Sequence, residues 1–391
     1  LADEDRPVFR WVYDCGSNQT EALIREINRV GGPLDLLFLS HLDNDHVNGV
    51  DTLLATWPTQ EVVLPYLNDD ERLVLMAGAA SAGALSGSYL AFASDPAAWL
   101  LSRGVQRVTF IQGGDDGEGG EADGRDKSPL DDRIARDRSP PMRGVWSASH
   151  PTTASGDIQV VPAGASLDVP GTSGVAIWTL LPQAHRPSPR LLKAFHDELG
   201  IKFTTLVPAD IAQAARTVSG RIDLAACYEK IWGDHNLITL SLYAGPHHAD
   251  FEEWRANVLA RPMRRIARET RHALGWISTG DAKLSVKARR RGFHRFFRQY
   301  LSQTAVLVTP HHGSATSWHD DVLDGFDNLR IGCAAAGPNG YDHPNQKVID
   351  AIEAHPGATF VQVDGEVRSD VLLEVHRSRR PPSLFSHRAR A

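Results

Sequence analysis

The chain has 391 residues, of which 42% are hydrophobic, and a formal net charge of −7 at pH 7. This length allows one large domain or two to three small ones, and the mild negative charge gives no general attraction to nucleic acid. No apolar run approaches the roughly 18 residues that predict a membrane span, and the charged first residues do not resemble a signal peptide. Three widely spaced cysteines, Cys15, Cys227 and Cys333, favour a reducing, cytoplasmic compartment over a disulfide scaffold.

The N-terminal part alternates short strands and helices. The continuous apolar run at 34–40 is typical of a strand that is covered on both faces, and the helical spacing at 20–31 ends at a glycine. The predicted strands are 9–16, 34–40 and 61–67, and the predicted helices are 20–31 and 47–57. This alternation predicts a layered α/β fold.

The middle of the chain is less regular. Residues 69–103 are rich in Ala and Leu and predict helices, followed by a strand at 105–112. Residues 113–141 contain almost no large apolar side chains, so we expect a mobile, disordered loop at about 113–143 within an insertion at 69–150. After two strands at 157–163 and 175–182, a second, helical insertion is predicted at 186–230.

The last third returns to regular structure. The predicted strands are 235–245, 273–281, 305–314, 330–337, 359–363 and 371–375, and the predicted helices are 251–272, 283–301 and 345–355. Residues 377–391 form a basic segment that we expect to be flexible.

Four potential metal ligands follow the apolar strand 34–40 directly: His41, Asp43, Asp45 and His46. In a loop at a strand end, this spacing can direct one pair of side chains toward each of two neighbouring cations. The alternative is a polar turn in which Asn44 or Asp45 caps the next helix. Because a cap does not require two flanking histidines, we favour a metal site.

Three later segments also end an apolar strand in polar residues. They supply Asp281, the pair His311 and His312, and His343. Since α/β folds place ligands at the carboxyl ends of their strands, we expect these side chains to converge with the first motif.

These motifs resemble those of the metallo-β-lactamase fold superfamily. The set is most similar to the domain of this fold in bacterial DNA-uptake (competence) channel proteins, and it comprises VYDCG (12–16), SHLDNDHVNG (40–49), STGD (278–281), TPHHGS (309–314) and PNGYDHP (338–344). The resemblance implies a single α/β domain over 1–391, an αββα sandwich with inserted segments. The chain departs from the commoner motif at Asp43, where most members have a histidine, and it keeps one glycine after His46.

The resemblance implies a site for two divalent metal ions, Zn²⁺ or Mn²⁺. His41 and Asp43 would hold the first ion, Asp45 and His46 the second, with Asp281 as the bridge. His311 would be a further ligand of the second ion. A further ligand of the first ion would be one of three residues, Asp234, His235 or Asn236. The residues implied in catalysis are Asp45, His312 and His343. His312 and His343 would donate a proton to the leaving group or a hydrogen bond to the substrate, and His343 remains an alternative ligand.

A basic stretch follows Asp281 and could contact a phosphate backbone. It includes Arg289, Arg290 and Arg291 among phenylalanines, and Ser314 and Asn339 are further candidate substrate contacts. The alternative is a solvated helix face whose aromatic side chains point into the core.

The motifs together predict a metal-dependent hydrolase, foremost a phosphodiesterase or nuclease that attacks DNA or RNA with a hydroxide shared by two metal ions. One alternative is hydrolysis of a small molecule such as a lactone, a thioester or a cyclic nucleotide. Another is a metal-stabilised interaction module in a multi-protein bacterial defence system. We expect no membrane partner, and a regulatory protein partner stays open.

Overall fold

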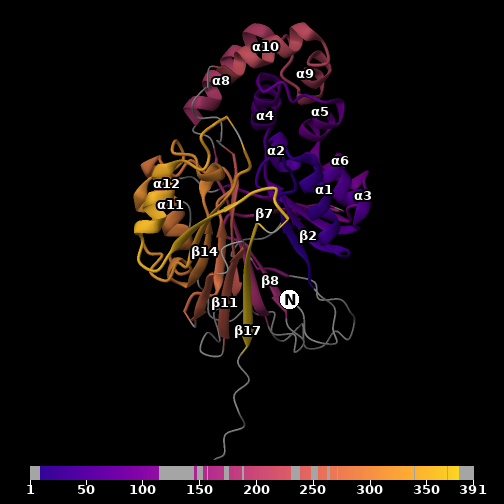
Figure 1. Cartoon of the computed structure of the whole chain (residues 1–391). Coiled ribbons are helices and arrows are strands. Elements are labelled where there is room, and N and C mark those ends of the chain that lie inside the picture. The colour runs from indigo at the N-terminus through magenta and orange to yellow at the C-terminus, as the bar shows by residue number, and fades with distance from the viewer. Residues whose placement is uncertain are drawn as a thin grey trace, which may run out of the picture.

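In the computed structural model, two β-sheets lie face to face, and helices cover their outer faces (Figure 1). The structure describes residues 9–113, 145–147, 153–155, 157–170, 176–186, 189–229, 238–247, 254–261, 265–270, 272–338, 340–367 and 369–377. Several predictions lie outside the described residues: the loop of about 113–143 beyond its first residue, the tail beyond 377, Asp234, His235, Asn236 and Asn339.

The first sheet has six strands in the order β1-β2-β3-β4-β7-β6, and only β6 pairs antiparallel with its neighbour. Its strands are β1 (Trp11–Tyr13), β2 (Leu34–Phe38), β3 (Thr59–Pro65), β4 (Arg107–Ile111), β6 (Thr153–Ser155) and β7 (Ile158–Val161). In β2, Leu36 and Phe38 face the second sheet while Leu37 packs under helices. Burial on both faces explains why this strand has a continuous apolar sequence.

The second sheet has eight strands in the order β16-β15-β14-β13-β10-β9-β8-β5. They are β5 (Val145–Ser147), β8 (Ser166–Pro170), β9 (Ala176–Ala184), β10 (Leu240–Pro246), β13 (Gly275–Ser278), β14 (Thr304–Val308), β15 (Ile331–Ala335) and β16 (Thr359–Val363). Along β10, Leu240, Leu242 and Ala244 pack against the first sheet, whereas Tyr243 lies in the core beneath the outer helices. This alternation is the two-residue period of a strand.

Helices enclose the two sheets on both sides. The bounds are α1 (Thr20–Arg29), α2 (Asn44–Val47), α3 (Val50–Thr56), α4 (Asp69–Ser81), α5 (Gly87–Ser94), α6 (Pro96–Leu101), α8 (Pro189–Lys202), α9 (Pro208–Ala214), α10 (Val218–Glu229), α11 (Lys287–Phe297) and α12 (Gln346–Ala354). Helices α1, α3 and α6 lie on the side of the first sheet, and α11 and α12 on the side of the second (Figure 1). The predicted layered α/β fold, a sandwich with helices outside, is confirmed.

The helix predicted at 251–272 is wrong, because the described part of this segment forms two strands. These are β11 (Trp254–Arg261) and β12 (Arg265–Thr270), which join β17 (Asp370–Arg377) in an antiparallel sheet of three strands. Every second side chain of β11 is buried: Trp254, Ala256, Val258 and Ala260. These side chains pack on the second sheet, so tertiary contacts outweigh the helical propensity of an Arg- and Ala-rich sequence.

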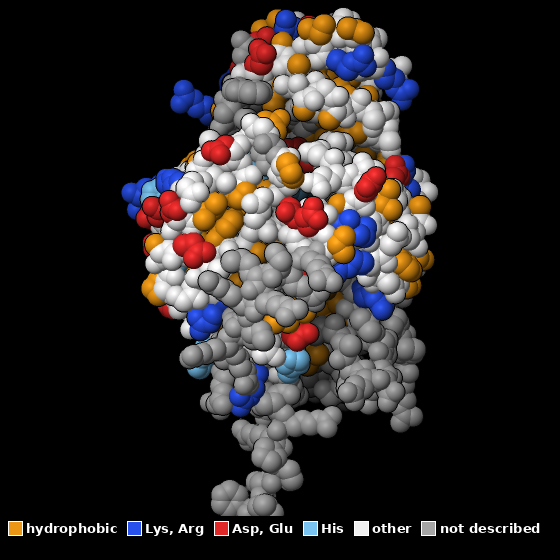
Figure 2. Space-filling model, viewed as in Figure 1, with side chains coloured by type: hydrophobic (Ala, Val, Ile, Leu, Met, Phe, Trp, Pro, Cys, Tyr) orange, Lys and Arg blue, Asp and Glu red, His pale blue; other side chains and the backbone are white. Residues whose placement is uncertain are grey.

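Helices α8, α9 and α10 form one end of the molecule above α4 and α5 (Figure 1). Their inner side chains belong to the same core as α4 and β2. Hydrophobic and basic side chains share the surface at this end in Figure 2, and four apolar side chains of this region are exposed: Ile201, Val207, Val218 and Ile222. Among the described helices, none combines the length and the apolar character needed to cross a bilayer.

Candidate metal centre

Three strand ends meet at one edge of the sandwich. His41 follows β2, Asp281 follows β13, and β14 leads into the 3-10 helix η3 (Pro310–Gly313), which carries His311 and His312. Strands β13 and β14 are parallel neighbours, so their carboxyl ends lie side by side. The fold therefore brings together the polar strand ends that the sequence analysis singled out.

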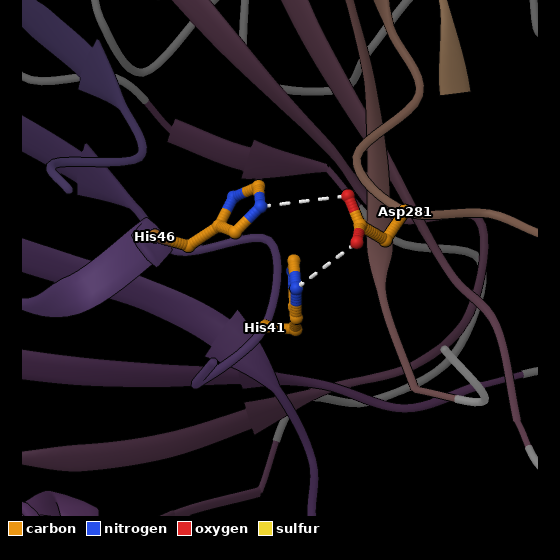
Figure 3. Close-up of side chains that lie close together, drawn as sticks. All are labelled: His41, His46 and Asp281. Atoms are coloured by element: carbon orange, nitrogen blue, oxygen red, sulfur yellow. Dashed lines mark ion pairs between the residues drawn. The ribbon is translucent and has the colours of Figure 1, made fainter. Parts of the chain in front are cut away.

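The buried side chains of His41, His46 and Asp281 form the middle of this group. His41 Nε2 lies 3.7 Å from Asp281 Oδ2, and His46 Nε2 lies 3.4 Å from Asp281 Oδ1 (Figure 3). The two imidazoles approach the carboxylate from the N-terminal half of the chain, with ring centroids 4.0 Å apart. Each carboxylate oxygen thus faces a different imidazole, as a bridging ligand would.

These separations fit a cation better than direct hydrogen bonds. Within the part of the chain that the structure describes, the buried Nε2 atoms of His41 and His46 have no hydrogen-bond partner. Distances of 3.4 Å and 3.7 Å to Asp281 exceed the usual range of a hydrogen bond, which ends at about 3.2 Å. Two ligands that are each about 2.1 Å from one tetrahedral zinc ion lie roughly 3.4 Å apart.

Hydrogen bonds on the far side of both rings orient the Nε2 atom of each ring toward Asp281. Ser40 Oγ donates its proton to Asp14 Oδ2 at 2.6 Å, so His41 Nδ1 must donate to Ser40 Oγ at 2.8 Å. His46 Nδ1 donates to the same Asp14 oxygen at 2.8 Å. With hydrogen on Nδ1, a neutral imidazole presents its Nε2 lone pair to a cation.

A first group of ligands surrounds Asp281 Oδ2. His41 Nε2 lies 3.7 Å from Asp43 Oδ2, and His311 Nε2 lies 3.6 Å from Asp281 Oδ2. The other ring nitrogen of His311 is 3.4 Å from Ser317 Oγ. We call His41, Asp43, His311 and Asp281 Oδ2 the first ligand group.

A second group lies on the side of Asp281 Oδ1. One ligand atom from each of Asp45, His46 and His312 lies within 4.8 Å of the others, and His312 Nε2 is 3.4 Å from Asp45 Oδ2. His312 Nδ1 donates to Ala335 O at 2.8 Å. With Asp281 Oδ1, these residues are the second ligand group, and His312 takes the place in it that the resemblance implied for His311.

Neighbouring charged groups shift the pKa of two residues in the centre, His46 and Asp45. Burial opposes the charged form of His46, but the Asp14 and Asp281 carboxylates outweigh it and hold the pKa of His46 well above its usual range. Burial likewise opposes the charge of Asp45, yet a hydrogen bond from His312 lowers the pKa of this carboxyl to about 2. Asp45 is therefore ionised at neutral pH, and a cation must displace a proton from His46.

The backbone around the centre is strained at two candidate ligands and at the residue that orients the central imidazoles. Asp14, His311 and His312 adopt left-handed conformations with φ of 58°, 49° and 54°, which cost about 1–3 kcal/mol each in residues other than glycine. Gly16 is required for close packing, because a Cβ atom there would lie 2.4 Å from the carbonyl oxygen of Asp45. This contact fixes the turn after β1 against α2.

Two further predicted residues lie next to the ligand groups. The half-buried ring of His343 has its centroid 5.2 Å from that of His311. Ser314 is only 1% exposed, and its hydroxyl shares a hydrogen bond of 2.9 Å with Thr316 Oγ1. Ser314 therefore stabilises the turn after η3 and does not present its hydroxyl at the surface.

The basic helix α11 does not expose the stripe that the substrate hypothesis needs. Arg289 is buried and donates to Arg186 O at 3.1 Å, and the buried Arg290 forms an ion pair of 3.0 Å with Asp321. Only Arg291 of the three predicted contacts is exposed. The aromatic side chains of this helix are all buried: Phe293, Phe296 and Phe297. The aromatic side chains thus point into the core, as the alternative interpretation expected, but Arg289 and Arg290 are buried and do not form a solvated face.

Asp14 and Ser40 were not among the predicted site residues, although their carboxylate and hydroxyl orient both central imidazoles. The signal that could have found them is VYDCG, in which Asp14 comes directly after β1. This strand pairs parallel with β2, so Asp14 had to lie beside the end of the strand that carries the ligand motif.

Comparison with known proteins gives a family match for the N-terminal part of the chain. A family model described as the metallo-beta-lactamase superfamily matches residues 9–161, which include His41 to His46 but not Asp281 or η3. A search of curated proteins found no match. The α/β architecture is consistent with the αββα fold of that superfamily, and the match together with the His and Asp clusters indicates a metal-dependent hydrolase.

Proposed function

We propose that the chain is a phosphodiesterase or nuclease that uses two divalent metal ions, Zn²⁺ or Mn²⁺, to cleave DNA or RNA. The observation that carries this proposal is the pair of ligand groups that share Asp281, one on each carboxylate oxygen. Two-metal sites for phosphoryl transfer hold their ions about 3.5–4 Å apart, and a bridging carboxylate spans that separation.

Bound divalent cations would supply Lewis-acid stabilisation of the oxygens around phosphorus and would make water nucleophilic at neutral pH. The part of this chain is to hold them. Asp281 keeps its charge because, although burial works against ionisation, the imidazoles of His311, His41 and His46 hold its pKa well below the usual range. Asp43 makes the first group richer in oxygen, which favours Mn²⁺ while still permitting Zn²⁺.

Different histidines take different roles in this proposal. His312 acts as a ligand of the second group, since its Nε2 faces Asp45 and its Nδ1 is fixed by a backbone carbonyl. His343 is proposed to donate a proton to the leaving oxygen, because its half-buried ring lies next to that of the ligand His311. Asp45, with a pKa of about 2, serves as a ligand and not as an acid.

Two observations support a nucleic-acid substrate and a cytoplasmic location. The later motifs, TPHHGS and PNGYDHP, extend the resemblance to the domain of DNA-uptake channel proteins beyond the part that the superfamily model matches. All three cysteines are buried and free, which supports a reducing compartment.

The first prediction tests the proposed activity. With Mn²⁺, the purified protein should cut single- or double-stranded DNA, and Asp45→Ala combined with Asp281→Ala should abolish cutting and metal retention together. The measurements are a nuclease gel and elemental analysis of the same samples. The control is Asp350→Ala, which removes an exposed carboxylate of α12 and should leave both unchanged. Cutting that survives in the double variant would contradict the proposed centre.

A second candidate function is hydrolysis of a small molecule such as a lactone, a thioester or a cyclic nucleotide. Tyr89 of α5 and Tyr228 of α10 are buried. Burial is the main cause that raises the pKa of both phenols, and the negative charge of Asp43 raises it further. Helices of the proposed insertions therefore come near the acidic side of the centre, where they could contact a small substrate. Turnover of bis-p-nitrophenyl phosphate or a lactone without any cutting of DNA or RNA would favour this candidate. A regulatory partner and a role in a defence assembly stay predictions.

A further inference from the structure

Tyr341 is the most exposed large hydrophobic side chain among the described residues, with 79% of its surface accessible. Single exposed hydrophobic side chains are common on protein surfaces, so the exposure of this ring assigns it no role without its position. Its position in the loop after β15 makes it a candidate for contact with a ligand.

The ring of Tyr341 continues a series of rings that leads to the metal centre. Its centroid lies 6.2 Å from that of His343, with an interplanar angle of 31°, and His343 lies 5.2 Å from His311. His311 in turn faces Asp281 Oδ2 at 3.6 Å. Tyr341 is thus placed one side chain outside the residue proposed to protonate the leaving group.

The loop that carries Tyr341 is held against η3. Asn345 donates from its backbone nitrogen to Gly313 O at 3.0 Å and from its side chain to Asp342 Oδ2 at 2.6 Å. A Cβ atom on Gly313 would lie 2.8 Å from Pro344 Cβ, so the loop and η3 pack closely. These contacts fix the loop that carries the ring relative to the ligand histidines, which is the preorganisation a binding group needs.

We propose that Tyr341 stacks on an unpaired nucleobase next to the phosphate held at the metal centre. This inference rests on the proposed phosphodiester substrate and narrows it to single-stranded nucleic acid or frayed ends, because a base within a duplex offers no free face. Stacking on an aromatic side chain tolerates every base, since each base has a π-face. The phenol also provides a wide contact area at low entropic cost, because it has only two side-chain torsions.

The second prediction uses an oligothymidylate and a matched chain built from abasic tetrahydrofuran units. Tyr341→Ala should raise KM for the oligothymidylate about 5- to 150-fold, the loss that corresponds to one stacked base, while kcat changes little. KM for the abasic chain should not change. Tyr341→Phe and Tyr341→Trp should keep the wild-type KM, and Ile201→Ala, which shortens an exposed side chain on α8, serves as the surface control.

A merely structural role for Tyr341 would affect both substrates equally, and that result would overturn the inference while leaving the proposed function intact. If the wild-type protein cuts neither the oligothymidylate nor the abasic oligomer, the inference is tested by measuring binding. Fluorescence anisotropy in the presence of Mn²⁺ should then show that Tyr341→Ala, made in the otherwise wild-type protein, weakens binding of the oligothymidylate but not binding of the abasic oligomer. Equal affinities with and without Tyr341 would also overturn the inference.

Discussion

Asp14 is proposed to bind no metal, yet its carboxylate accepts hydrogen bonds from Ser40 and His46 and so sets the ring orientation on both sides of Asp281. The third prediction is that Asp14→Asn lowers metal affinity about 10- to 100-fold, the usual cost of removing a residue that orients a ligand. An amide nitrogen in place of Oδ2 cannot accept the protons that Ser40 and His46 donate.

Metal affinity in Asp14→Asn can be measured by competition with a chromophoric chelator. The control is Asp35→Asn, because the Asp35 carboxylate also accepts a backbone hydrogen bond, from Arg10 at 2.7 Å, but on β2 away from the centre. Unchanged affinity in a folded Asp14→Asn protein would show that the imidazoles hold their orientation without this carboxylate.

At the residue scale, the candidate ligands could be found from the sequence, and the resemblance implied their grouping except for the places of His311 and His312. Histidine and aspartate at strand ends are visible in the chain, since ligand chemistry belongs to the residue itself. The choice between His311 and His312 depends on the left-handed turn at both residues, which directs one ring to Asp281 Oδ2 and the other to Asp45. Two adjacent histidines carry no local signal that separates these directions.

At the scale of elements, the close packing of α10 on α4 is the contact that holds the helical end in place. A Cβ atom on Gly78 of α4 would lie 3.1 Å from the ring of Tyr228 in α10. In α8, a Cβ atom on Gly200 would meet no heavy atom within 4 Å. The two glycines therefore give a matched pair of substitutions in helix interiors.

The fourth prediction is that Gly78→Ala and Gly200→Ala change stability in opposite directions. Gly200→Ala should stabilise the protein by about 0.5–1 kcal/mol, the usual gain from removing a helical glycine. Gly78→Ala should destabilise it by about 1–3 kcal/mol, because the added methyl overpacks the Tyr228 ring. Urea unfolding measures both, and equal stabilisation by the two substitutions would mean that α10 has room to move.

Elements also show where local sequence misleads. The segment 251–272 combines Arg, Ala and Leu, which favour a helix, but β11 buries every second side chain against the second sheet. Helix α11 was predicted correctly as a helix, but two of its three candidate contact residues are buried: Arg289 donates to Arg186 O and Arg290 pairs with Asp321, while Arg291 is exposed. In both cases a neighbour that is distant in sequence decides which side chains are buried.

At the scale of the whole molecule, the proposed centre joins the two halves of the sandwich. His41, Asp43, Asp45 and His46 follow the first sheet, while Asp281, His311 and His312 follow strands of the second. A cation that binds both sets binds only the folded chain, so it should add its binding free energy to the stability of the fold.

The fifth prediction is that removal of metal with a chelator lowers the melting temperature of the wild type by several degrees and that Mn²⁺ or Zn²⁺ restores it. At a metal concentration 100 times Kd, the expected stabilisation is about 2.7 kcal/mol. The Asp45→Ala and Asp281→Ala double variant should melt at the same temperature with and without metal. Differential scanning fluorimetry measures the shift, and a shift that persists in the double variant would place the metal elsewhere.

The sequence by itself determined most of the strand-and-helix alternation, the candidate ligand residues and their positions at strand ends, because periodicity and donor chemistry are properties of consecutive residues. Only the tertiary structure decided which imidazole faces which carboxylate oxygen, which arginines are buried, and that 254–261 is a strand. Those outcomes depend on contacts between segments far apart in the chain, where the free energy of packing exceeds the preference of any local stretch.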